Sequence, residues 1–130
     1  MKLNDYFEMP FSFTQKQVEL FAKVTGDYNP IHLDDEYASK SIFKKKIMHG
    51  FLSASVFSKI IGMHFPGNGA VYLSQTMNFL QPMYAGMVYK AKVKVAECIE
   101  MKNRFVLETY VYNSNEEITL DGKATIQYKE

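Results

Sequence analysis

The sequence contains a single cysteine, Cys98, and only three histidines, His32, His49 and His64. One thiol cannot form an intrachain disulfide, and it offers no cluster of thiolates to a structural metal. The single cysteine argues against a disulfide-stabilised secreted domain, and with only three scattered histidines it also argues against a zinc site. We therefore expect a protein without a structural metal.

Long apolar segments and an excess of one charge are also absent. No run reaches the roughly 18 apolar residues that a membrane span needs, and residues 1–11 lack the apolar core of a signal peptide. Fifteen basic and fourteen acidic residues leave a net charge of +1, so nucleic-acid binding has little electrostatic support. We expect a cytoplasmic protein that binds neither membranes nor nucleic acid.

Length and composition fit one globular domain. Hydrophobic residues make up 47% of the sequence and charged residues 22%, which is an ordinary balance for a folded protein. A chain of 130 residues can bury one substantial core but is short for two. We expect a single domain spanning residues 1–130.

Helical signals dominate the first half of the chain. Thr14, with Gln17 three residues later, matches a capping box, and Gly26 permits the left-handed residue that ends a helix. A short helix is predicted within residues 34–41. Residues 49–65, HGFLSASVFSKIIGMHF, are apolar nearly all round, which is typical of a buried helix.

Strand signals dominate the second half. Alternating or β-rich patterns predict strands within residues 66–82, 87–101, 104–113 and 117–129. A break is expected in the last of these at Asp121 and Gly122. Residues 7–14, which contain Pro10, suit an edge strand. The sequence thus predicts an α+β fold, in which an antiparallel sheet wraps around one buried central helix, residues 49–65.

The segment GDYNPIHLDD, residues 26–35, brings several chemically useful side chains together. Pro30 excludes a regular helix and pushes Asn29 toward extended geometry. Such a rigid turn can aim the Asp27 carboxylate and the His32 imidazole into one space, as an acid–base pair requires. The alternative is an ordinary turn, in which the side chains of Asp27 and Asn29 bond their own backbone.

A second candidate feature stands at the start of the predicted central helix. At His49 and Gly50, unpaired N–H groups meet the positive end of the helix dipole. This arrangement suits an oxygen that gains negative charge during a reaction, although tight packing would also explain Gly50. Ser58 falls on a neighbouring part of the same helix face. It could bond an active-site carboxylate or the carbonyl one turn back.

Three segments together resemble the MaoC-like dehydratase family, specifically its short, single-domain R-specific enoyl-CoA hydratases. They are FAKVTGDYNPIHLDDEYA, IMHGFLSASVFSKIIG and PGNGAVYLSQTMNFLQPMYAG, in that order along nearly the full chain. The resemblance implies a hot-dog fold and homodimers whose sheets join edge to edge. It also implies hydration of a trans-2-enoyl-CoA to the (R)-3-hydroxyacyl-CoA, or the reverse dehydration, without a cofactor.

Carried over by position, the resemblance implies a role for each candidate residue. Asp27 and His32 would hold and activate water. The Gly50 N–H would bind the thioester oxygen, and Ser58 would orient the Asp27 carboxylate. Supporting residues of the turn would be Asn29 and His49. Weaker substrate-binding candidates are Lys44, Lys45 and Lys46, which could meet the CoA phosphates, together with Leu52, Tyr72 and Gln75.

Two other functions remain open at the level of sequence. A hot-dog thioesterase would share the fold and could direct water at the thioester carbonyl, although the turn from Asp27 to His32 disfavours it. A non-catalytic acyl-CoA-binding domain would tolerate the loss of Asp27, His32 and Gly50, all of which this chain retains.

Overall fold

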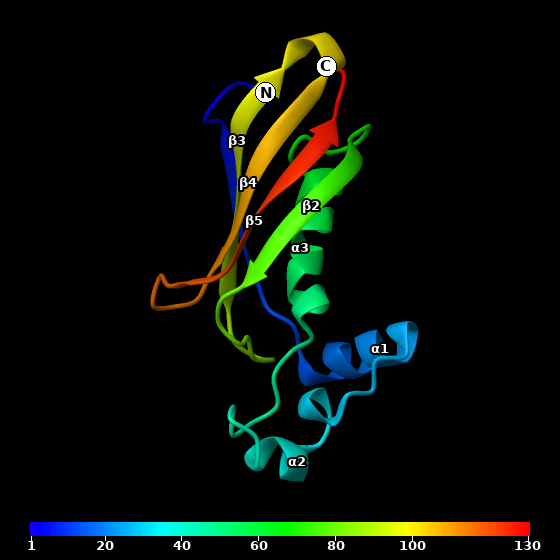
Figure 1. Cartoon of the computed structure of the whole chain (residues 1–130), viewed down its shortest axis with the longest axis vertical. Helices are drawn as coiled ribbons and strands as arrows, with labels where there is room; N and C mark the ends of the chain where they lie inside the picture. The colour runs from blue at the N-terminus through cyan, green and yellow to red at the C-terminus, as the bar shows by residue number, and fades with distance from the viewer.

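The computed structural model describes all residues, 1–130, and shows one antiparallel sheet beside a long helix (Figure 1). Along the chain the elements are β1 (Tyr6–Phe11), α1 (Gln15–Thr25), the 3₁₀ turn η1 (Pro30–His32), α2 (Asp35–Ser39), α3 (Gly50–Met63), β2 (Val71–Phe79), β3 (Tyr89–Ile99), the 3₁₀ turn η2 (Glu100–Lys102), β4 (Arg104–Tyr112) and β5 (Ile118–Gln127). No helix combines the length and the apolar character that crossing a membrane requires.

The five strands lie in the order β1-β3-β4-β5-β2, and every neighbouring pair is antiparallel. β3, β4 and β5 form a meander, while β1 with its Pro10 is an edge strand, as predicted. Alternation along the strands buries Val93, Leu107 and Ala124 completely and turns Lys92 toward the opposite face. The predicted α+β class is confirmed.

The expected break in the last strand is wrong. β5 runs unbroken through Asp121 and Gly122, and Gly122 has another purpose. A Cβ atom at this position would lie 1.8 Å from the carbonyl oxygen of Thr76 in β2. Only glycine lets the edge strand β2 approach β5 so closely.

Helix α3 packs against one face of the sheet and runs beside β2 (Figure 1). Its sheet-facing side contributes the buried residues Val56, Phe57, Ile60 and Ile61. The prediction of a helix buried all round is wrong for one chain, because Phe51 and Met63 expose 67% and 73% of their surface. The sheet therefore covers α3 from one side only.

Helix α1 begins and ends as its sequence predicts. The Thr14 hydroxyl accepts a hydrogen bond from the Gln17 N–H at 3.1 Å, and the Gln17 side chain accepts from the Thr14 N–H at 2.8 Å. Gly26 ends the helix with a left-handed φ of 80°. Figure 1 shows α1 and α2 grouped at the end of the molecule where α3 begins, which brings residues 26–35 to that end.

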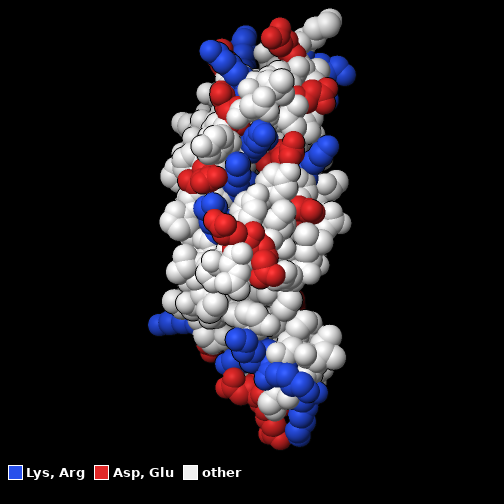
Figure 2. All heavy atoms as spheres, turned by 90° about the vertical axis from the view of Figure 1, so that its left-hand side faces the viewer, with Lys and Arg blue, Asp and Glu red and all other residues white.

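Charges are mixed over the face of the molecule drawn in Figure 2, where blue and red side chains alternate without a large area of one sign. Charges of opposite sign also pair across neighbouring strands, as Lys92 of β3 does with Glu8 of β1 at 3.7 Å. This face therefore offers no basic platform of the kind that binds nucleic acid.

Candidate active site

Asp27 follows helix α1 by two residues and is held at three points. Its N–H donates to Thr25 Oγ1 at 3.2 Å, its Oδ1 accepts from the Asn29 N–H at 3.2 Å, and its carbonyl oxygen accepts from His49 Nε2 at 3.1 Å. The side chain is nevertheless 51% exposed. Oδ1 is thus committed to the turn, and Oδ2 is left to meet a substrate or a water molecule.

The turn η1 carries the chain from Asp27 to His32. Asn29 caps it, since its side-chain oxygen accepts from the Ile31 N–H at 3.3 Å, and Pro30 occupies its first position. The ordinary turn that the sequence allowed as an alternative is therefore present. It does not compete with an acid–base pair, because the same turn sets Asp27 and His32 next to each other.

His32 is buried and presents one defined nitrogen. Its Nδ1 lies 2.8 Å from the Ile47 carbonyl oxygen, and because a carbonyl only accepts, the neutral ring carries its proton on Nδ1 and leaves Nε2 unprotonated. Burial lowers the pKa of His32 below its ordinary value, and His49 adds to this against the opposing effects of the Ile47 carbonyl and Asp27. A neutral His32 with a free Nε2 is suited to general-base chemistry.

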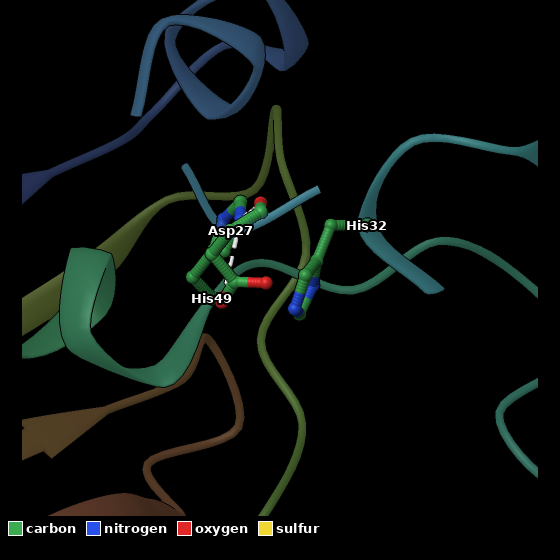
Figure 3. Close-up of side chains that lie close together, drawn as sticks. All are labelled: Asp27, His32 and His49. Atoms are coloured by element: carbon green, nitrogen blue, oxygen red, sulfur yellow. Dashed lines mark hydrogen bonds and ion pairs between the residues drawn. The ribbon is translucent and has the colours of Figure 1, made fainter. Parts of the chain in front are cut away.

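His49 completes the cluster from the start of α3. It is 3% exposed, its ring stacks on His32 with the ring centroids 3.8 Å apart, and Phe21 packs on it at 4.9 Å. Figure 3 shows His49, from the start of α3, meeting Asp27 and His32, which both belong to the turn of residues 26–35. One nitrogen or oxygen atom from each of the three side chains lies within 4.8 Å of those of the other two.

Gly50 is the first residue of α3, and its N–H has no acceptor within the chain. A Cβ atom at this position would lie 2.7 Å from the ring of Phe79, so packing does require glycine. Gly50 also lines the cavity beside His32. The tight packing and an available N–H at a helix N-terminus thus occur together.

A cavity of about 490 Å³ opens beside this cluster. Its polar wall includes His32, Gly50 and Ser53. Its apolar walls include Ile47, Met48, Phe79, Met83 and Leu120. Such a pocket suits an apolar chain with a polar head placed at the histidine end.

Ser58 is not part of this cluster. It lies two helical turns beyond Gly50, about 12 Å along the axis of α3, and its side chain is exposed. Asp27 is oriented instead by the N–H of Asn29. No hydrogen bond joins Ser58 to Asp27 within the single chain, so the role of Ser58 in orienting the carboxylate stays a prediction.

The weaker candidates also lie away from the cavity wall. Leu52 is 7% exposed and belongs to the core cluster. Lys45 Nζ stands 4.1 Å from the centre of the Tyr84 ring, and Lys46 pairs with Asp35 at 3.3 Å. Lys44 is exposed. Contact of these lysines with CoA phosphates stays a prediction.

Tyr72 and Gln75 form a hydrogen-bonded network that ties β2 to the sheet. The Tyr72 hydroxyl donates to the Gln75 side chain, whose Nε2 donates to Thr109 Oγ1 at 3.0 Å and to the Thr76 carbonyl at 2.8 Å. Burial raises the pKa of Tyr72 to about 12. Neither residue lines the cavity in one chain, so their part in substrate binding also stays a prediction.

Three groups at the site were not predicted from the sequence: the Ser53 side chain, the Ile47 carbonyl and the Phe79 ring. Ser53 lies three residues after Gly50, a spacing that places both on one helix face, so this signal was available. The Ile47 carbonyl and the Phe79 ring left no such signal, because they reach the site from a loop and from an edge strand.

The three side chains in Figure 3 do not form a good metal site. The planes of His32 and His49 are inclined by only 28°, and each ring already has one nitrogen near a carbonyl oxygen. A zinc ion binds in the plane of each imidazole at roughly 2.0–2.1 Å, whereas stacked rings direct their nitrogens along nearly parallel planes. The donor geometry thus disfavours a metal, and the predicted lack of a cofactor stays a prediction.

An imidazole with a free nitrogen and a helix N-terminus at one end of an apolar pocket, with a carboxylate beside the imidazole, are typical of enzymes that move protons beside a polarised carbonyl. Comparison with known proteins identifies the group within this class. The family model described as "MaoC like domain" matches residues 4–117. The chain belongs to the MaoC-like family.

Comparison with individual proteins supports the same family. The chain is 41% identical to a 3-hydroxybutyryl-CoA dehydratase of Methylorubrum extorquens over 107 residues, which are 82% of this chain and 68% of that protein. It is 34% identical to an (R)-specific enoyl-CoA hydratase of Aeromonas caviae over 115 residues, 88% of this chain and 86% of that one.

A solved structure extends the likeness to three dimensions. The structure titled as the (R)-hydratase from A. caviae involved in PHA biosynthesis matches with a TM-score of 0.96 at 30% identity, over 99% of this chain and 98% of that chain. The predicted hot-dog fold is thereby confirmed. The family and these relatives place the chain among the hydratase and dehydratase enzymes.

Proposed function

We propose that the protein adds water across the double bond of a trans-2-enoyl-CoA to give the (R)-3-hydroxyacyl-CoA, and catalyses the reverse dehydration. One observation carries this proposal: His32 and Gly50 line the same apolar cavity, and the Asp27 carboxylate lies beside His32. The likeness to an enoyl-CoA hydratase and to a hydroxyacyl-CoA dehydratase supports the same chemistry.

The helix start would stabilise the charge that forms during reaction. Attack of water at C3 moves electrons to the thioester oxygen, which gains enolate character. In the proposal this oxygen accepts a hydrogen bond from the Gly50 N–H, at the positive end of the α3 dipole. A donor of this kind is worth about 2.7–4 kcal/mol in the transition state. The acyl chain would extend along Met48 and Met83 into the cavity.

The Asp27–His32 pair would manage the protons. Water is held between Asp27 Oδ2 and His32 Nε2, its oxygen bonds to C3, and one of its protons passes to the pair. A proton from the pair then reaches C2, so the pair ends the cycle with the number of protons it began with. The two residues would act as one unit, because an oxygen of Asp27 and a nitrogen of His32 lie within 4.8 Å of each other.

A second copy of the chain would complete the enzyme as a homodimer. The edge strand β2 exposes Val71 and Leu73 by 53% and 43%, and the uncovered side of α3 exposes Phe51. An exposed apolar edge strand is a ready partner for another strand. Pairing of two such edges would cover these residues and join the sheets edge to edge.

The test is an assay of the purified protein with crotonyl-CoA and longer enoyl-CoA substrates. Loss of enoyl absorbance without release of free thiol, together with the R product on chiral analysis, is the expected result. Release of thiol would indicate a thioesterase instead. No reaction at any chain length would contradict both enzyme functions and favour a binding domain.

A further inference from the structure

We propose that His49 is a positioning residue of this reaction, which fixes the Asp27 main chain and braces the His32 ring without touching the substrate. The inference rests on the proposed function, and it assigns the buried histidine a task beyond shaping the turn. It starts from the three contacts of the His49 ring, with Asp27, His32 and Phe21.

The first contact sets where Asp27 stands relative to α3. Two of the hydrogen bonds of Asp27, to Thr25 and Asn29, lie within its own turn. The third joins its carbonyl oxygen to His49 Nε2 at 3.1 Å and is the one that reaches the helix start. Asp27 Oδ2 also lies 4.0 Å from this nitrogen. This bond therefore holds the carboxylate at a set distance from the Gly50 N–H.

The second contact concerns the direction of His32. The two rings stack with centroids 3.8 Å apart, so His49 forms a flat support beside the imidazole that would accept the proton. His32 is tied at Nδ1 to the Ile47 carbonyl but could otherwise pivot about that bond. A ring packed against its face restrains this pivot and keeps Nε2 directed toward the water position.

The protonation pattern of His49 separates positioning from catalysis. Because a carbonyl only accepts, Nε2 carries the proton, and in the neutral ring Nδ1 is bare. Nδ1 is buried and has no hydrogen-bond partner. Nε2 is occupied by the Asp27 carbonyl oxygen and Nδ1 is buried, so neither nitrogen is placed to exchange a proton with a substrate.

Packing alone does not explain a histidine at this position. A phenyl ring would fill the space between Phe21 and His32 without leaving a buried nitrogen unpaired, which is an unfavourable arrangement. What a phenyl ring lacks is the N–H that bonds Asp27. The hydrogen bond to the Asp27 carbonyl is therefore the reason for an imidazole.

Two variants separate the hydrogen bond from the ring. His49→Phe keeps a ring against His32 and loses the donor, whereas His49→Gln loses the ring but can place an amide N–H near the position of Nε2. We expect His49→Phe to lower kcat by about 10²-fold, the effect of displacing a reacting group by about 1 Å. KM should change less than about threefold, because the lost interaction acts mainly in the transition state. His49→Gln should retain at least a tenth of the wild-type kcat.

Wild-type activity in His49→Phe would overturn the proposal, and so would a folded His49→Gln that is as impaired as His49→Phe. A measurement on the wild-type protein covers the case in which the variants do not fold. Long-range ¹H–¹⁵N NMR should find His49 protonated at Nε2 and His32 protonated at Nδ1. A proton on Nδ1 of His49 would overturn the proposal. Expected tautomers in a protein inactive on every enoyl-CoA would refute the proposed function and leave the hold on Asp27 standing.

Discussion

The two ends of helix α3 each carry a histidine, in contrasting surroundings. His49 precedes the first residue of the helix, is 3% exposed and lies between His32 and Phe21. His64 follows the last residue, is exposed, and stacks on Phe7 at 5.2 Å. The N-terminal end offers free N–H groups and faces a turn that bears a carboxylate. The two imidazoles therefore differ mainly in their neighbours, since His49 lies beside a carboxylate and a second imidazole.

The largest effects are expected from the residues that face the N-terminal end of α3. Asp27→Asn and His32→Ala should each lower kcat for crotonyl-CoA hydration by about 10²–10⁴-fold, since each removes a member of the proton-transfer pair. Circular dichroism and thermal unfolding would verify that both variants remain folded. Near-normal turnover in either one would end the assignment of the pair.

The glycines near the two ends of α3 form a matched pair. Gly50→Ala puts a Cβ atom 2.7 Å from the Phe79 ring, whereas a Cβ atom at Gly62 meets nothing within 4 Å. We expect Gly50→Ala to cost about 1–3 kcal/mol of stability through overpacking and to lower kcat about 10²-fold by displacing the N–H. Gly62→Ala should gain about 0.5–1 kcal/mol and keep full activity. Equal activity in the two variants would mean that the start of α3 has no special role.

The acid limb of the pH profile tests the surroundings of His32. Burial lowers its pKa below 6.5, so kcat/KM for hydration should stay high as the pH falls to 6.5 and decline only below it. The stability of the fold should also decrease as the pH falls. Between the lowered pKa and 6.5 the unfolded chain binds more protons than the folded one, so the free energy of unfolding falls with falling pH. An NMR titration of His32 that gives a midpoint above 6.5 would contradict this.

The smallest effect is expected at the C-terminal end of α3. His64→Ala removes one exposed stacking contact with Phe7, which is worth at most about 1 kcal/mol. Thermal unfolding should detect at most this loss, and kcat should match that of the wild type. A tenfold fall in kcat without a loss of stability would show that this end contributes to the reaction as well.

The sequence predicted best what is local. The capping box of Thr14 and Gln17, the left-handed Gly26 and the turn at Asn29 and Pro30 each depend on a few adjacent residues. The alternating strands were equally legible, because a half-buried strand repeats every two residues. These local signals were enough to place Asp27 in one turn with His32.

Other features depend on geometry that local patterns do not contain. Helical periodicity indicates on which face a residue lies but not how far along the axis, so Ser58 could share a face with Gly50 and still stand about 12 Å away. Gly122 was read as a strand break because the approach of Thr76 from another strand leaves no mark nearby. The cytoplasmic location and the single-domain organisation stay predictions.

The main-chain N–H and C=O of Ile47 are both hydrogen-bonded to the turn that bears His32. Its N–H donates to the Ile31 carbonyl at 3.2 Å, and its own carbonyl accepts from His32 at 2.8 Å. Residues 33–46 therefore form a segment whose two ends are held together by hydrogen bonds. Changes at its exposed positions, such as Ile42 and Lys44, should therefore be tolerated without moving His32 or α3.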